Sequence, residues 1–113
     1  MRLLLDENLP KRLKLDFADH EVYTVLEKGW NGFQNGKLLQ AMLEDDFHAL
    51  LTFDKNLQHQ QNFNKYLITV FVLSAKRNTC GELTKFTRLI QHYLKQETLP
   101  VGAIVIQSEP PNM

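Results

Sequence analysis

The sequence predicts one α/β domain, a three-layer α/β/α sandwich in which a mainly parallel sheet of about five strands lies between helices. Three observations predict this class. Short apolar runs recur along the chain, amphipathic patterns lie between them, and turn-forming residues separate the two kinds of segment. A chain of 113 residues can form one core and is too short to divide. Residues 1–113 are therefore expected to form a single domain.

Five segments have the composition of strands. Residues 3–5 and 49–53 are short apolar runs, and residues 21–25 alternate with β-prone side chains. Residues 66–73 are apolar almost throughout, which indicates a central strand that is covered on both faces. Residues 102–106 are expected to form the last strand.

Three segments between these strands have helical patterns. Apolar side chains recur every three or four positions in residues 9–17 and 36–45. Thr79 and Glu82 match a capping box, which opens the longest predicted helix and precedes apolar positions up to residue 94. The alternation of strands and helices predicts parallel strands that are joined by right-handed crossovers.

Charge and cysteine content limit the environment and the partners. Thirteen basic residues balance thirteen acidic ones, so the average charge does not indicate a strongly basic nucleic-acid binder. A nucleic-acid partner requires only a local basic patch. The single cysteine, Cys80, cannot form an internal disulfide, and no apolar run approaches the roughly 20 residues that cross a bilayer. We expect a cytoplasmic protein without membrane contact.

Acidic residues follow two of the predicted strands. Asp6 and Glu7 come directly after the first strand, and Asp54 follows the third. If these strands are parallel neighbours, Asp6 and Asp54 converge at the edge where α/β sheets bind ligands. Adjacent carboxylates need a compensating cation or proton, and hard oxygen ligands suit Mg²⁺ or Mn²⁺, which serve phosphoryl chemistry. The alternative is that Asp6 or Asn8, and likewise Asp54, only cap the helices that follow.

Other polar residues are expected at the same edge. Predicted substrate contacts are Thr52, Lys55, Arg77 and Asn78. Arg77 could bind a phosphate bidentately or could pair with one of the aspartates. A basic helix face, either solvated or in contact with RNA, is formed by Lys11, Arg12 and Lys14. Trp30 and Phe33 lie in a glycine-flanked loop, where they either anchor the loop on the core or stack a base.

Three segments together resemble a family of short PIN-like proteins. They are Leu-Leu-Leu-Asp-Glu-Asn-Leu-Pro (residues 3–10), Leu-Leu-Thr-Phe-Asp-Lys-Asn-Leu (50–57) and Val-Leu-Ser-Ala-Lys-Arg-Asn-Thr (72–79). The resemblance spans essentially the whole chain and implies a PIN-like α/β sandwich with a Mg²⁺- or Mn²⁺-dependent ribonuclease site. It implies Asp6 and Asp54 as metal-coordinating carboxylates and Glu7 as a further catalytic acid. The implied partners are an RNA substrate and a small cognate antitoxin, and a second copy of the chain is another candidate partner.

Two departures from the family pattern keep other functions open. Asn35 and Asn56 stand where the family has acidic residues, so the chain could be a degenerate PIN-like module that binds RNA or protein without cleavage. A third hypothesis is a signalling receiver domain with Asp54 as its phospho-acceptor. Receivers need a lysine after the last strand, where this chain has Ile106-Gln107-Ser108, and this argues against the third hypothesis.

Overall fold

The structure of the protein, a computed structural model, describes residues 1–53, 66–74 and 86–107. The elements in these ranges are β1 (Arg2–Leu5), η1 (Lys11–Phe17), β2 (Glu21–Thr24), α1 (Asn35–Glu44), β3 (Ala49–Thr52), β4 (Thr69–Ser74), α4 (Thr87–Leu94) and β5 (Gly102–Gln107). The α/β class and the five predicted strands are confirmed. The capping box at Thr79 and Glu82 and the segment that begins at Asp54 lie outside the described residues.

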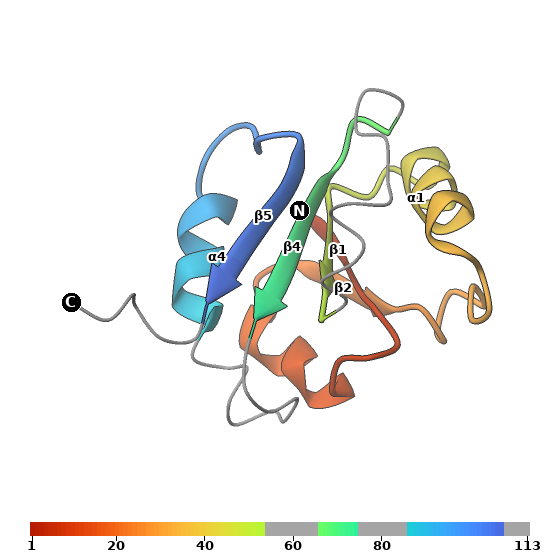
Figure 1. The fold of residues 1–113 in the computed structure, drawn as a ribbon. Helices are drawn as coiled ribbons and strands as arrows, with labels where there is room; N and C mark the ends of the chain where they lie inside the picture. The colour runs from red at the N-terminus through yellow and green to blue at the C-terminus, as the bar shows by residue number, and fades with distance from the viewer. Residues whose placement is uncertain (54–65, 75–85, 108–113) are drawn as a thin grey trace.

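The five strands form one parallel sheet in the order β2-β1-β3-β4-β5 (Figure 1). Leu5 of β1 pairs with Thr24 of β2 on one side and with Leu51 of β3 on the other. Because all strands run in the same direction, their carboxyl ends meet at one edge of the sheet, which we call the carboxyl edge. The chain moves from β1 to β2 in one direction and places β3 on the opposite side of β1, so the strand order reverses between β1 and β3.

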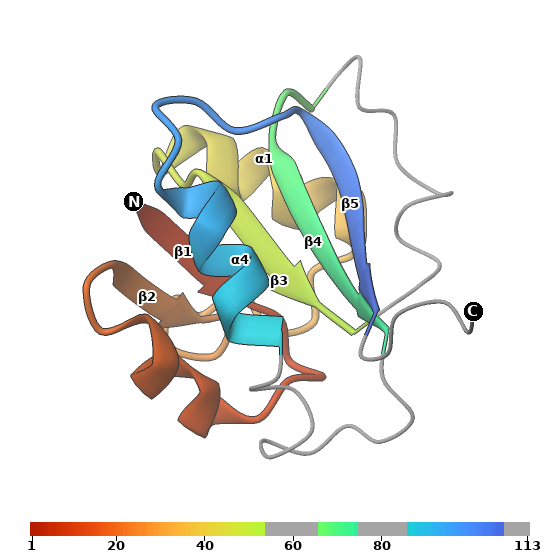
Figure 2. The same cartoon turned by 90° about the vertical axis from the view of Figure 1, so that its left-hand side faces the viewer.

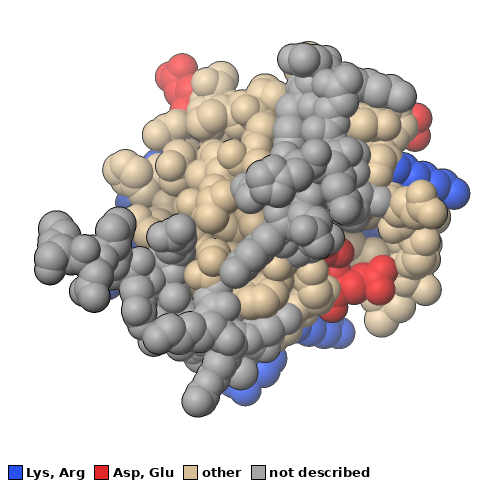
Figure 3. Space-filling model, viewed as in Figure 1, with Lys and Arg blue, Asp and Glu red and all other residues tan. Residues whose placement is uncertain are grey.

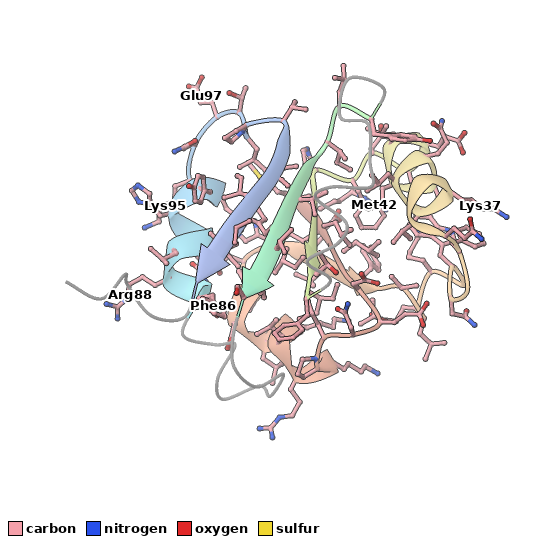
Figure 4. The ribbon with its side chains drawn as sticks, viewed as in Figure 1. Lys37, Met42, Phe86, Arg88, Lys95 and Glu97 are labelled. Carbon is pink, nitrogen blue, oxygen red and sulfur yellow. The ribbon has the colours of Figure 1, made fainter. Side chains whose placement is uncertain are left out.

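Helices cover both faces of this sheet. On one face Leu3 and Leu5 pack with side chains of η1 and α4, and on the other Leu4 packs with Met42 of α1. Figure 2 shows α4 and η1 in front of the sheet and α1 behind it. In Figure 4, Met42 lies on the side of α1 that faces the strands, whereas Lys37 extends away from them. The predicted three-layer α/β/α arrangement is therefore present.

The connection from β4 to β5 has a different hand from the predicted right-handed crossovers. The chain passes from β1 to β2 over the η1 face and from β2 to β3 in the opposite direction over the α1 face, so these two connections have the same, right hand. From β4 to β5 the chain moves across the sheet in the same direction as from β2 to β3. The helix of this connection, α4, nevertheless lies on the η1 face and not on the α1 face (Figure 2). This connection is therefore left-handed, which is rare.

The position of α4 fills a part of the sheet that η1 does not cover. η1 packs beside β2, while Ile90 of α4 packs in the same core as Phe71 of β4. Asp16 joins the two helices: its side chain accepts a hydrogen bond from the Thr87 hydroxyl at 3.0 Å, and its carbonyl accepts one from Gln91 Nε2 at 2.7 Å. Together the two helices close this core.

The predicted amphipathic helix at residues 9–17 is a 3₁₀-helix. Its start follows Pro10, whose carbonyl accepts the N–H of Leu13 at 3.1 Å, an i to i+3 bond. Leu13 and Phe17 are buried as predicted, whereas Leu15 is 73% exposed. No side chain caps the start of η1. Neither Asp6 nor Asn8 is therefore the N-cap of this helix.

The described surface is uneven in charge. In Figure 3 the part that surrounds β5 carries few charged side chains, and the acidic and basic groups lie mainly toward its margins. Val101 and Val105 are exposed in and next to β5. None of the helices in the described part of the chain is long and apolar enough to cross a membrane.

Candidate functional site

The carboxyl edge between β1 and β3 holds the first predicted acidic pair. β1 ends at Leu5, but the N–H of Asp6 still donates to the carbonyl of Leu51 at 2.9 Å and adds a last rung between the strands. The chain then turns, because the N–H of Leu9 donates back to the Asp6 carbonyl at 3.1 Å. The prediction that β1 and β3 are parallel neighbours is confirmed. Asp6 therefore lies where the strand order reverses, the usual ligand position in such sheets.

Two hydrogen bonds orient the Asp6 carboxylate. The Thr52 hydroxyl donates to Oδ2 at 2.7 Å, and the backbone N–H of Glu7 donates to Oδ1 at 2.8 Å. The Thr52 side chain is buried at the end of β3, with an exposed fraction of 0%. Since donors to an ionised carboxylate form strong bonds, these two contacts hold Asp6 in one orientation.

Thr52 positions other groups at this edge, and its predicted role as a substrate contact stays a prediction. Its side chain is buried, and its hydroxyl donates to Asp6. The same oxygen accepts a hydrogen bond from Asn8 Nδ2 at 3.4 Å, and Asn8 Oδ1 accepts the N–H of Phe53 at 3.0 Å. Asn8 thus ties the turn after β1 to the end of β3.

Glu7 lies on the same side of the edge as Asp6. Consecutive residues of an extended strand would point to opposite faces, but the turn begins here and brings both side chains to one pocket. Glu7 Oε1 accepts the N–H of Gly32 at 3.1 Å. Gly32 has a φ of +87°, a conformation that residues with a Cβ rarely adopt. Glu7 therefore connects the turn after β1 with the loop that follows β2.

The pocket at this edge has a volume of about 290 Å³. Its lining combines two carboxylates, an ammonium group, a hydroxyl, a carboxamide and three aliphatic side chains, from Asp6, Glu7, Leu9, Lys11, Thr24, Val25, Leu26 and Asn31. A small pocket with apolar walls and a few polar groups is typical of a ligand site.

The loop that forms one wall of the pocket is fixed at its start by a reciprocal pair. The backbone N–H of Thr24 donates to Glu27 Oε1 at 2.8 Å, and the N–H of Glu27 donates to the Thr24 hydroxyl at 3.1 Å. A hydrogen bond from Lys14, and then one from the Thr24 backbone, lower the pKa of Glu27 to about 2. The Thr-x-x-Glu spacing is the capping-box pattern, so this pair could have been found in the sequence.

The aromatic residues of the same loop anchor it on the core. Trp30 stacks on Phe33 with ring centroids 6.4 Å apart and meets Phe47 edge-on at 5.7 Å. Both loop residues pack against the core that α1 covers. Of the two interpretations of Trp30 and Phe33, the structure supports the one in which they anchor the loop on the core.

The pocket holds two carboxylates, the kind of oxygen ligand that hard divalent cations take. The described ranges contain no group of three or more His, Cys, Asp or Glu side chains that could hold a metal ion. Mg²⁺, however, is commonly bound through one or two carboxylates, with water and substrate phosphate as its other ligands. Asp6 and Glu7 supply such a donor set. The remaining predicted site residues, Asp54, Lys55, Arg77 and Asn78, lie outside the described residues, as does Asn56.

The fold and the site define a class: an α/β domain whose five described strands are parallel, with a pocket at the carboxyl edge that contains two carboxylates. No protein-family model matches the sequence, and it has no match among curated proteins or solved structures.

The strand order bears on the receiver hypothesis. The order 2-1-3-4-5 is the flavodoxin-like order, which receiver domains share. Two features of this chain oppose that function. Gln107 ends β5 where a receiver has its lysine close by, and α4 lies on the η1 face, which makes its connection left-handed and unlike a doubly wound fold.

Proposed function

We propose that this protein is a metal-dependent, PIN-like endoribonuclease that cleaves RNA at the carboxyl edge. The observation that supports this most directly is the position of Asp6 and Glu7 directly after β1, at the carboxyl edge where the strand order reverses. Both residues also line the pocket that opens on the β2 side of β1. Each of these carboxylates is also bonded to a group on another segment, Asp6 to Thr52 and Glu7 to Gly32.

In this proposal Asp6 and Glu7 bind Mg²⁺ or Mn²⁺ through their carboxylate oxygens, and Asp54 is a further metal ligand. Such an ion, when bound, neutralises phosphate charge and makes water a better nucleophile. Thr52 keeps the Asp6 carboxylate oriented, and Gly32 does the same for Glu7. Asp54 is assigned from the sequence, because it follows Phe53, whose N–H is held by Asn8 at this edge.

The proposal also covers the substrate and a regulator. Lys55, Arg77 and Asn78 are proposed to hold the RNA backbone, because Arg and Lys pair with phosphate. The resemblance further suggests that the protein is the toxin of a toxin–antitoxin pair, neutralised by a small cognate protein. Growth arrest on expression of the wild type, and none on expression of Asp6→Asn, would agree with this assignment.

Cleavage of labelled RNA by the purified protein tests the nuclease proposal. We expect cleavage with Mn²⁺ or Mg²⁺, none with chelator, and a rate at least about 100-fold lower for Asp6→Asn. The matched control is Asp19→Asn, which makes the same charge change at an exposed residue just before β2, at the opposite edge of the sheet. Cleavage that persists in chelator, or that Asp6→Asn retains, would contradict the proposal.

A second candidate function is a binding module without catalysis. Asn35 and Asn56 favour it, since an amide oxygen can coordinate a cation but adds no charge to the site. In that case wild type and Asp6→Asn bind RNA with similar affinity, and neither cleaves it with any metal. The binding and cleavage assays on this one pair of proteins separate the two functions.

A further inference from the structure

We infer that the pocket beside the acidic pair binds one unstacked nucleobase of the RNA, next to the phosphate that is cleaved. This assignment rests on the proposed function and adds the substrate class to it. The same pocket holds Asp6 and Glu7 and an aliphatic wall, so a nucleotide whose phosphate meets the carboxylates through a cation has its base within reach of that wall.

The aliphatic wall has a buried floor and an exposed margin. Leu9 and Val25 are 8% and 1% exposed, whereas Leu26 is 72% exposed although it lines the pocket. Flat apolar faces such as those of nucleobases bind between side chains of this kind. The apolar surface of Leu26 loses contact with water when a base covers it, and this favours binding.

The wall is preformed. The N–H of Val25 donates to the carbonyl of Leu5 at 3.1 Å, and the N–H of Trp30 donates to the carbonyl of Val25 at 3.0 Å. The Trp30 ring also packs against Phe47 of the core. A base therefore binds against a loop that is already ordered, so binding does not include the entropic cost of ordering it.

The polar groups of the lining match the other parts of a nucleotide. Asn31 has an exposed carboxamide, which can donate to and accept from the edge of a base. Lys11 supplies an exposed ammonium group, the counter-charge that an RNA backbone requires beside two carboxylates. The volume, about 290 Å³, lies at the lower limit of ligand pockets and fits one base better than two.

Occupation of this pocket requires a base that has left its stack. Bases within an A-form duplex are stacked and paired, whereas those of single strands and loops can turn outward. The substrate class is therefore single-stranded RNA or the loop of a structured RNA, and a continuous duplex is excluded.

Nucleotide titration without metal tests the pocket independently of catalysis. The four ribonucleoside 3′-monophosphates are added to nitrogen-15-labelled full-length protein in chelator, and amide shifts are followed by NMR. We expect saturable shifts at Val25, Leu26 and Asn31 with at least one nucleotide. Leu26→Ala should raise the Kd about fivefold, because it removes apolar surface that a bound base would cover. Leu15→Ala, at a residue that is equally exposed (73%) and is not among the pocket residues, should leave the Kd unchanged.

The outcomes separate this inference from the proposed function. Absence of shifts with all four nucleotides overturns the base pocket, even if RNA is cleaved in a metal- and Asp6-dependent reaction. Equal weakening by Leu26→Ala and Leu15→Ala also overturns it. Saturable shifts that Leu26→Ala weakens support the pocket. If no RNA is then cleaved with any metal, the ribonuclease proposal fails while the nucleotide site stands.

Discussion

Replacement of Thr52 by valine removes the hydroxyl that orients the Asp6 carboxylate. Valine has nearly the same shape and suits a buried strand, so the change removes the 2.7 Å bond to Asp6 without opening a cavity. A hydrogen bond to a charged group contributes about 1.5–3 kcal/mol. Asp6 is only half-buried and can be rehydrated, so we expect a loss of about 1–2 kcal/mol in the free energy of unfolding, measured by urea denaturation. The rate of metal-dependent cleavage should fall by about 10–100-fold, as for other residues that orient a metal ligand.

Thr69→Val is the matched control for this experiment. Thr69 is 2% exposed in the neighbouring strand β4, and its hydroxyl donates to the carbonyl of Pro100 at 2.6 Å. The acceptor is neutral, and Thr69 begins β4 at the edge of the sheet opposite the acidic pair. The variant should therefore lose about 0.5–1.5 kcal/mol of stability and keep its metal-dependent activity. If Thr52→Val and Thr69→Val retain the same activity, the positioning role of Thr52 is wrong.

Three further predictions concern stability, each measured by urea unfolding. The pKa of Glu27 in the folded protein, about 2, lies below its ordinary value of 4.5, so its hydrogen bonds stabilise the fold above about pH 4.5 and this stabilisation is lost as the pH falls toward 2. In Glu27→Gln the free energy of unfolding should fall less between pH 4.5 and 2 than in the wild type. An equal fall in both proteins would refute the pairing. Gly32→Ala and Gly29→Ala should each lower the free energy of unfolding by about 1 kcal/mol, because both glycines have a positive φ (+87° and +73°). The added methyl group meets no atom within 4 Å, so the backbone alone determines the loss. A stabilised variant would contradict these φ values. Phe71→Ala should cost about 3–5 kcal/mol, and Leu89→Ala, at a 51% exposed position, less than about 0.5; equal effects would place the core elsewhere.

The strands could be predicted because their burial leaves few alternatives. Residues 70–73 have exposed fractions of 0% and are all apolar, so the run has no polar face that could support an amphipathic helix. The face that each helix covers could not be predicted. Ile90 and Leu94 identify an amphipathic helix, but its location beside η1 depends on which area of the sheet the other elements leave open.

The site could be predicted only in part, because most of its bonds join segments that are distant in the sequence. Asp6 and Glu7 were found because they directly follow an apolar run. The contact between Thr52 and Asp6 spans 46 positions and depends on the register in which Leu5 pairs with Leu51. A shift of one residue would turn the Thr52 side chain to the other face of the sheet, and sequence patterns do not fix register so finely.

The way in which β1 and β3 separate explains why the carboxylates are held so firmly. Within the described residues, the last backbone hydrogen bond between the two strands runs from the Asp6 N–H to the Leu51 carbonyl. Side chains continue the connection, since Asn8 bonds to both the hydroxyl of Thr52 and the N–H of Phe53. An aspartate at position 8 could accept the second bond but could not donate the first, and it would add a third negative charge. The asparagine therefore connects the ends of β1 and β3 beside the Asp6 carboxylate, while the pocket opens on the other side of β1, toward β2.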